Sequence, residues 1–167
     1  MSDNLNIHLP EYFREFLTEL NHHDVEYMLI GGYAMGTYGH VRTTGDLDIF
    51  IEATRANAKK MMQACIAYGI EEENLLLDMF MVPRMVVIGE APLRIEIIKK
   101  LDTVDFKYAY QRVKTMQVDN LAVPVVNLDD LIRLKHAAVK GRNKARDSED
   151  LTFLQKLKAA LTNSGKL

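Results

Sequence analysis

Hydrophobic residues recur in this chain with two spacings, one typical of helices and one typical of strands. Apolar residues three or four positions apart predict helices, which we expect at residues 10–22, 32–38, 54–68, 105–113, 128–140 and 145–161. Short apolar or alternating segments predict strands, which we expect at residues 25–30, 46–52, 85–88, 93–98, 115–118 and 121–126. Turn residues at 89–92 and 119–120 join the last four strands into two hairpins.

This order of helices and strands predicts an α+β fold, with helices packed on a small mixed β-sheet. We expect residues 1–126 to form the core and residues 127–167 to form a C-terminal helical part packed on the same domain. A chain of 167 residues is long enough for one domain with a sizeable hydrophobic core.

Residues 46–51, within the second expected strand, include two carboxylates among otherwise apolar residues. Because strand side chains alternate between faces, Asp46 and Asp48 point one way while Leu47 and Ile49 point into a core. Two carboxylates side by side repel each other, and a bound Mg²⁺ would remove that conflict. The alternative is an edge strand, or an acidic turn before the strand, with both acids in solvent.

Two consecutive glycines, Gly31 and Gly32, stand where a predicted strand gives way to a predicted helix. Glycine lets the backbone approach a ligand closely, and N–H groups at a helix start attract phosphate. Any tight turn can use such a pair, so the pair alone is weak support for a binding site. With Asp46 following 14 residues after Gly32, the combination indicates a nucleotide with its metal.

A third carboxylate, Glu96, lies in the middle of the apolar strand 93–98, on the same face as Arg94. A charge there is costly without a partner. One interpretation pairs Glu96 with Arg94 or with a neighbouring strand. The other makes Glu96 a third carboxylate of the metal site.

The segment 133–146 carries six basic residues and no acid: Arg133, Lys135, Lys140, Arg142, Lys144 and Arg146. A solvated helix end would explain them, since cations are favourable near a helix C-terminus. A local phosphate-binding surface is the second interpretation.

The pattern Gly31-Gly32-x-Ala34, followed by His40-x-Arg42-x-Thr44-x-Asp46-x-Asp48, resembles the signature of minimal nucleotidyltransferases of the DNA polymerase β superfamily. It is most similar to the branch containing abortive-infection toxin-type enzymes and aminoglycoside nucleotidyltransferases. The resemblance is strongest over residues 25–51 and continues weakly through 93–100 and 123–154. This sequence departs from the family pattern in three ways. Tyr33 stands where many members have serine, the gap from there to the Asp-x-Asp is longer by two residues, and Glu96 stands where the family usually has aspartate.

The resemblance implies a transferase that moves a nucleoside monophosphate from a nucleoside triphosphate, expected to be ATP, to an acceptor hydroxyl. It implies that one or two Mg²⁺ are held by the catalytic carboxylates, which are Asp46, Asp48 and Glu96. The residues expected to bind the nucleotide are Gly31, Gly32, Arg42, Thr44 and Lys135. By the same resemblance, Asp147 and Asp150 orient basic side chains and hold the last two helices together.

The resemblance permits several acceptors, namely a tRNA end, a protein hydroxyl or an aminoglycoside hydroxyl, and it suggests a role in a toxin–antitoxin pair. Two other classes stay open. One is a catalytically silent nucleotidyltransferase fold that acts as a binding partner or antitoxin, and the other is a nucleic-acid-binding module without catalysis.

Net charge, cysteine content and hydropathy limit the partners and the cellular compartment that we expect for this chain. A net charge of −2 gives no overall attraction to nucleic acid or to anionic membranes. The single cysteine, Cys65, excludes an internal disulfide and is expected to be a buried, inert thiol. The start of the chain has no signal-peptide pattern, and no window approaches the ~18 apolar residues of a membrane-spanning helix. We therefore expect a cytoplasmic protein without membrane contact.

Overall fold

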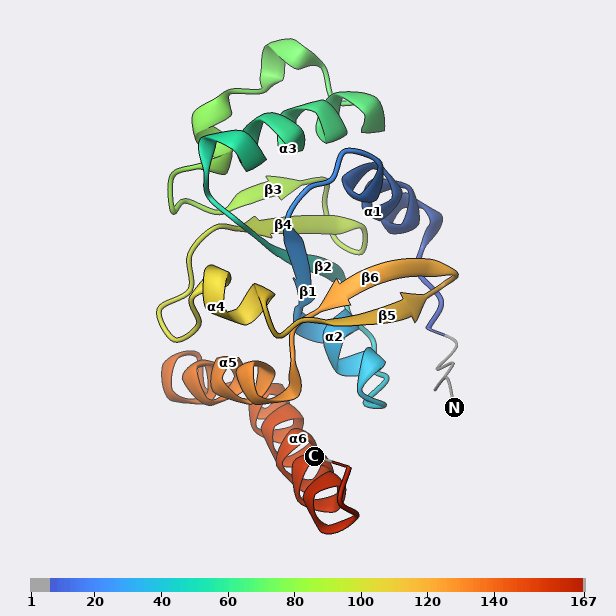
Figure 1. The fold of residues 1–167 in the computed structure, drawn as a ribbon, viewed down its shortest axis with the longest axis vertical. Helices are drawn as coiled ribbons and strands as arrows, with labels where there is room; N and C mark the ends of the chain where they lie inside the picture. Colours follow the sequence, from blue (N-terminus) through green and yellow to red (C-terminus); the bar gives the residue numbers. More distant parts are fainter. Residues whose placement is uncertain (1–6, 167) are drawn as a thin grey trace.

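A computed structural model describes residues 7–166 of the chain. Its centre is a six-stranded mixed sheet with the strand order β3-β4-β2-β1-β6-β5 (Figure 1). The strands are β1 (Tyr27–Ile30), β2 (Asp46–Ile51), β3 (Val86–Ile88), β4 (Arg94–Ile98), β5 (Lys114–Val118) and β6 (Leu121–Val125). Helices flank this sheet and form the C-terminal part, so the predicted α+β class is confirmed.

Strand β2 lies inside the sheet, antiparallel to β1 and parallel to β4. The two predicted hairpins are present, because β3 pairs with β4 and β5 pairs with β6, both antiparallel. Strands β1 and β6 pair in parallel, and this pair joins the β5–β6 hairpin to the rest of the sheet. The internal place of β2 excludes the edge-strand interpretation of its two acids.

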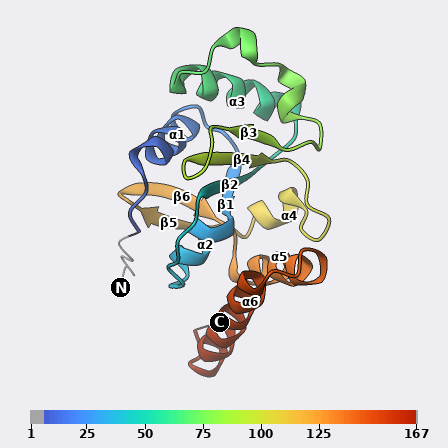
Figure 2. The ribbon, with the colours of Figure 1, turned by 180° about the vertical axis from the view of Figure 1, so that it is seen from behind.

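The helices occupy two regions on opposite sides of the sheet (Figures 1 and 2). They are α1 (Glu11–His22), α2 (Gly31–Thr37), α3 (Arg55–Tyr68), α4 (Phe106–Tyr110), α5 (Leu128–Gly141) and α6 (Ala145–Asn163). Helices α1 and α3 lie side by side on one side, whereas α5 and α6 lie together at the opposite end of the molecule. No helix within residues 7–166 is both long and apolar enough to cross a membrane.

The alternation of side chains along β2 and β4 separates the core from a polar face. Leu47, Ile49, Ile95 and Ile97 are fully buried and join the hydrophobic core. The residues that alternate with them along the two strands, including the acids, lie on the other face of the sheet, as the strand period of two predicts. The core face therefore anchors the strands that present the acids.

Local signals set most helix ends. Thr54 and Asn127 each accept a hydrogen bond from a backbone N–H in the first turn of α3 and α5, which satisfies a donor that the helix leaves free. Gly69 ends α3 with φ of +117°.

The structure also differs from the prediction in detail. Helix α4 is shorter than expected, and the ambiguous stretch after α3 forms two short 3₁₀ helices, η1 (Glu72–Asn74) and η2 (Leu77–Phe80). The boundary expected between residues 126 and 127 falls in the loop between β6 and α5, while residues 1–6 and 167 of the two expected parts lie outside the described residues.

Candidate functional site

Asp48 and Glu96 stand opposite each other on the two central parallel strands. The register of β2 and β4 pairs Asp48 with Glu96 and Asp46 with Arg94. Directly opposed residues of neighbouring strands have their side chains close together on one face. The sheet thus brings together two of the three predicted carboxylates, which are 48 residues apart in the sequence.

The environment of Asp48 opposes its charge. Burial, the adjacent Glu96 carboxylate and the more distant Asp46 together raise the pKa of Asp48 to about 8, although Lys135 acts in the opposite direction. The Oδ1 atom of Asp48 is buried and has no hydrogen-bond partner among the described residues. Such an atom is destabilising unless something binds it, and therefore marks the position as a candidate ligand.

Gly31 touches the same carboxylate. It has φ of +74°, and a Cβ atom built there would lie 2.2 Å from Asp48 Oδ2. Glycine is therefore required at residue 31 both by the backbone conformation and by the lack of space. The site thus includes the end of β1, as expected from the glycine pair.

Gly32 makes a second close approach, to the loop that precedes β2. A Cβ atom at Gly32 would lie 2.8 Å from Thr44 Oγ1. Thr44 also donates a hydrogen bond to the Asp46 carbonyl, with an oxygen–oxygen distance of 3.2 Å. In this structure Thr44 therefore shapes the turn that leads into Asp46.

Arg94 separates the carboxylates that were expected to converge. Its Nη2 atom lies 2.8 Å from Glu96 Oε1, and its Nε lies 3.9 Å from Asp46 Oδ1. Within residues 7–166 there is no group of three or more His, Cys, Asp or Glu side chains placed to hold a metal ion. Both interpretations of Glu96 therefore describe part of its environment, since it pairs with Arg94 and also neighbours Asp48.

A hard divalent cation fits Asp48 and Glu96 on chemical grounds. Their oxygens are the ligands that Mg²⁺ prefers, and Asp48 Oδ1 has no hydrogen-bond partner among the residues that the structure describes. A cation would also offset the repulsion that, together with burial, raises the pKa of Asp48. Asp46 is half-exposed beside Arg94, so it could join such a site only if the guanidinium moved.

A cavity of about 200 Å³ opens between these acids and α5. Two basic side chains, Lys135 and Arg142, line it opposite Asp48 and Glu96. Apolar side chains form the rest of its wall: Ile30, Ile98, Leu101, Leu131, Leu134 and Ala138. The cavity thus offers carboxylates on the sheet, cations on the helix, and an apolar surface between them.

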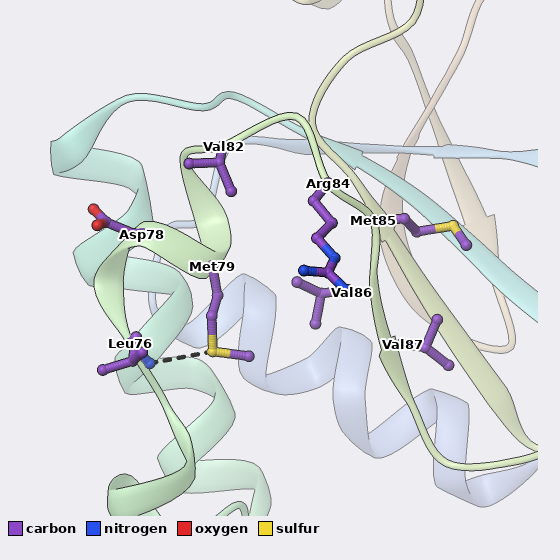
Figure 3. Close-up of a pocket in the computed structure, with 8 residues that line it drawn as sticks. All are labelled: Leu76, Asp78, Met79, Val82, Arg84, Met85, Val86 and Val87. Atoms are coloured by element: carbon purple, nitrogen blue, oxygen red, sulfur yellow. Dashed lines mark hydrogen bonds between the residues drawn. The ribbon is translucent and has the colours of Figure 1, made fainter.

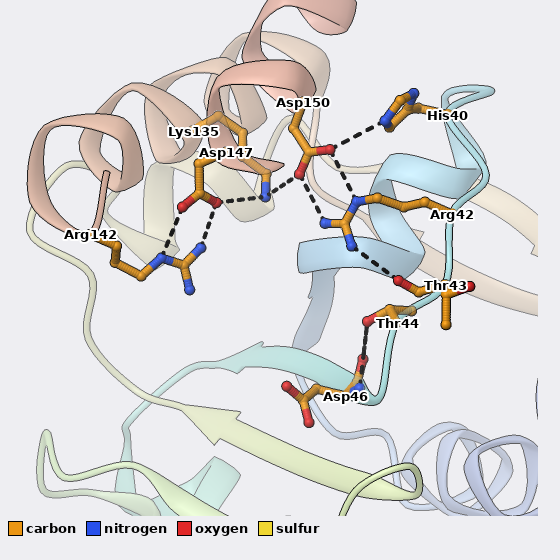
Figure 4. A network of polar contacts seen from close by, with 9 residues as sticks. All are labelled: His40, Arg42, Thr43, Thr44, Asp46, Lys135, Arg142, Asp147 and Asp150. Carbon is orange, nitrogen blue, oxygen red and sulfur yellow. Dashed lines mark hydrogen bonds and ion pairs between the residues drawn. The ribbon is translucent and has the colours of Figure 1, made fainter. Parts of the chain in front are cut away.

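Lys135 reaches this cavity while held by two buried acids of α6. Its Nζ atom lies 2.8 Å from Asp150 Oδ2 and 3.8 Å from Asp147 Oδ1 (Figure 4). Arg142 donates two hydrogen bonds to Asp147, at 2.7 and 3.2 Å. As expected, Asp147 and Asp150 hold basic side chains and tie α5 to α6.

Asp150 also connects α6 to the loop before β2. Arg42 donates to both of its carboxylate oxygens, at 3.0 and 2.8 Å, and His40 Nε2 lies 3.3 Å away (Figure 4). Burial alone would raise the pKa of Asp150, but hydrogen bonds from Arg42 and Lys135 hold it below its usual range. Arg42, expected to bind nucleotide, thus anchors the loop that presents Asp46.

Ion pairs occupy half of the basic segment 133–146. Besides Lys135 and Arg142, Arg133 pairs with the buried carboxylate of Asp130, which also binds Arg112. Three of the six basic side chains therefore already pair with buried acids, which weakens the case for an extended phosphate-binding surface.

Sequence reasoning undervalued two side chains of this region. Arg94 was expected only as a partner of Glu96, and the register of β2 and β4, which local sequence does not show, places it opposite Asp46 as well. Arg142 was one member of a basic run, and no local pattern distinguished it from its neighbours. Cys65 is buried as expected, and burial raises the pKa of its thiol to about 12.

A second cavity, of about 440 Å³, lies elsewhere, between η2 and the edge strand β3 (Figure 3). Its wall is largely apolar and includes Leu76, Val82, Met85 and Val87, with Asp78 and Arg84 as charged members. It lacks the convergent carboxylates of the first cavity and is not a second catalytic candidate.

Neither a scan against protein-family models nor a search of curated proteins finds a match for this chain. The site is therefore interpreted from its own residues and from the resemblance of its motifs.

Proposed function

We propose that this protein is a Mg²⁺-dependent nucleotidyltransferase that transfers a nucleoside monophosphate from a nucleoside triphosphate to an acceptor hydroxyl. The observation that carries the proposal is the opposed pair Asp48 and Glu96 on adjacent central strands, with the buried Asp48 Oδ1 lacking a hydrogen-bond partner within residues 7–166. A nucleotidyltransferase-like arrangement is compatible with the mixed sheet and its flanking helices.

Asp48 and Glu96 would hold the metal, with Asp46 joining them at the exposed rim. When bound, Mg²⁺ would neutralise charge on the phosphates and on the oxygens that attack and leave. Gly31 lies against Asp48 and Gly32 lies against Thr44, and the resemblance assigns the triphosphate to this glycine pair. Glu96 could also accept the proton of the acceptor hydroxyl, as a carboxylate beside the reacting groups can.

Lys135 supports the proposal from the opposite wall of the cavity. It is nearly fully buried and pre-oriented by Asp147 and Asp150, so little side-chain entropy is lost when it meets a phosphate. The loop anchored by Arg42 would keep Asp46 in place. Positioning and charge neutralisation would therefore supply most of the rate enhancement.

A catalytically silent fold that acts as a binding partner or antitoxin is the second candidate. It is favoured by the Arg94–Glu96 ion pair, which occupies a carboxylate that an active site needs free. Residue Tyr33 also packs edge-on against Phe13 with ring centres 5.7 Å apart, at the place where the related enzymes carry serine.

Binding of nucleotide to variants of the acid pair tests the proposal. We would titrate ATP and then the other nucleoside triphosphates by calorimetry, with and without Mg²⁺, into the wild type and into Asp46→Asn/Asp48→Asn. The matched control is Glu73→Gln/Asp78→Asn, which removes two exposed charges outside the site. Metal-dependent binding that is lost only in the first variant supports the proposal.

Absence of metal-dependent binding to any triphosphate would contradict the enzyme and favour the silent fold. If a triphosphate binds, transfer is tested with that nucleotide against tRNA, protein and aminoglycoside acceptors. The ion-paired basic segment gives no preference for RNA, so all three classes belong in the trial. A toxin–antitoxin role follows from the resemblance alone and needs a partner protein to be found.

A further inference from the structure

Arg94 lies over the exposed rim of the acidic site rather than at its base. Its side chain is 38% exposed, compared with 40% for Asp46 and 19% for Glu96. The guanidinium binds Glu96 at 2.8 Å but stays 3.9 Å from Asp46, which is too far for a hydrogen bond. It therefore has one strong contact and one purely electrostatic contact with the carboxylates.

Arg94 does not use all of its hydrogen-bond donors at this position. Its Nε atom is buried and finds no hydrogen-bond partner within the described residues. A bidentate arginine–carboxylate pair would use both Nε and Nη2, as Arg42 does with Asp150. Arg94 thus makes fewer polar contacts with its carboxylate than Arg42 does. Replacing Arg94 by another cation therefore breaks fewer contacts.

Arg94 places a positive charge beside Glu96 and near Asp46. Arginine keeps its proton at all ordinary pH values, so Glu96 always has a cation beside it in this arrangement. A divalent cation shared by Asp48 and Glu96 would compete with the guanidinium for Glu96 Oε1 and would be repelled by it. Both effects weaken metal binding for as long as Arg94 stays in place.

We propose that Arg94 is an internal counter-ion of the acidic site, which a divalent cation must displace from Glu96 and which, once displaced, contacts the phosphate chain of the nucleotide. This inference rests on the proposed function and adds a nucleotide-binding residue to it. Displacement couples the two ligands: the guanidinium opposes the metal when it binds alone and favours the metal together with the nucleotide.

The test compares Mn²⁺ binding, measured by calorimetry without nucleotide, in the wild type, Arg94→Gln and Arg94→Lys. Removing the charge should tighten Mn²⁺ binding by roughly two- to fivefold, the size expected for one partly exposed charge pair. Arg94→Lys keeps the charge and should stay near the wild type. Arg55→Gln removes the same charge from the exposed start of α3 and should change nothing.

The second measurement is ATP binding in the presence of saturating Mn²⁺. Arg94→Gln should bind ATP more weakly than the wild type, so the two ligands change in opposite directions. A purely structural role of Arg94 would weaken both together. Circular dichroism and thermal melting verify that each variant is folded.

The outcomes separate this inference from the function on which it rests. Wild-type Mn²⁺ binding that Asp48→Asn abolishes, but that Arg94→Gln leaves unchanged or weaker, overturns the role of Arg94 and leaves the metal site standing. No Mn²⁺ binding by either the wild type or folded Arg94→Gln overturns both. Binding that appears only in Arg94→Gln supports displacement and indicates a site that the wild type keeps closed.

Discussion

Asp48 of β2 and Glu96 of β4 face each other across a pair of parallel strands, and no described residue satisfies the buried Oδ1 of Asp48. Apposed carboxylates at the centre of a sheet oppose folding, because both must lose water and they repel each other. An arrangement of this kind is typical of functional sites, where stability is sacrificed for binding.

Asp48→Asn should stabilise the metal-free protein at alkaline pH. The pKa of Asp48, about 8, lies above its ordinary value of 3.8, so the folded state binds this proton more tightly than the unfolded state. Its contribution to stability is complete below pH 4 and is lost as the pH rises toward 8. Asparagine stays neutral throughout and should raise the free energy of unfolding at pH 8.5 by roughly 2 kcal/mol.

Urea unfolding in EDTA at pH 5 and pH 8.5 measures this difference, with exposed Glu73→Gln as the control. A gain at pH 8.5 that shrinks at pH 5 is the expected pattern. Equal loss of stability at both values would show that Asp48 is ionised and satisfied in the folded protein.

Asp150→Asn should be strongly destabilising. Asp150 is fully buried and accepts hydrogen bonds from Arg42 and Lys135, so its loss leaves two cations without their main partner. Breaking a buried pair of this kind costs about 3–5 kcal/mol. Denaturant unfolding at pH 7 measures the loss, and Asp129→Asn, which removes an exposed partner of Lys158, should cost less than about 1 kcal/mol.

The carboxylate of Asp150 should also determine how the free energy of unfolding falls at acidic pH, which is the acid limb of the stability curve. Because the folded pKa of Asp150 is lowered, its contribution is present above the pKa of the unfolded chain and is lost as the pH falls through the folded value. The wild type should therefore lose stability below about pH 4, and Asp150→Asn should show a flatter acid limb. If the free energy of unfolding fell equally with decreasing pH in the wild type and in Asp150→Asn, the role of Asp150 in acid stability would be contradicted.

Gly31→Ala should disrupt the site as well as the fold. The added Cβ would meet Asp48 Oδ2 at 2.2 Å, whereas Gly69 combines a positive φ of +117° with open space. Gly69→Ala therefore reports backbone strain alone, about 1 kcal/mol. Gly31→Ala should lose at least twice as much and should also lose metal-dependent nucleotide binding, which Gly69→Ala retains.

Filling the cavity beside α5 should block the ligand without altering the charged groups. Ala138 is a half-exposed member of its wall, so phenylalanine at residue 138 would occupy the space between the acids and the helix. We expect Ala138→Phe to bind ATP at least tenfold more weakly in calorimetry, with a change in stability below about 1 kcal/mol. Ala159→Phe, in a different groove on α6, should bind normally.

Several elements of the site could be read from local sequence because local rules govern them. The period of two along a strand correctly placed Asp46 and Asp48 on one face and Leu47 and Ile49 on the other. Asn127 was recognised as the cap of α5, since its side chain acts on a backbone group only three residues away. Turn residues at 119–120, both with positive φ, predicted the β5–β6 hairpin.

Long-range partners could not be read in the same way. Nothing near Glu96 in the sequence shows that β4 lies beside β2, and this register alone decides that Glu96 faces Asp48. Arg42 and Asp150 are 108 residues apart, so their pairing depends on how α6 packs against the loop before β2. The interpretation of β2 as an edge strand failed for the same reason, because strand order is a property of the whole sheet.

The sequence by itself therefore determined the elements, the face that each side chain occupies, and the residue types available for chemistry. Tertiary structure decided which charges meet, namely Arg94 with Glu96 and Asp150 with Arg42. It also left one buried oxygen of Asp48 without a partner in the described part of the chain. The physical reason is that local periodicity acts over a few residues, whereas burial and charge pairing depend on distances that only the packed chain establishes.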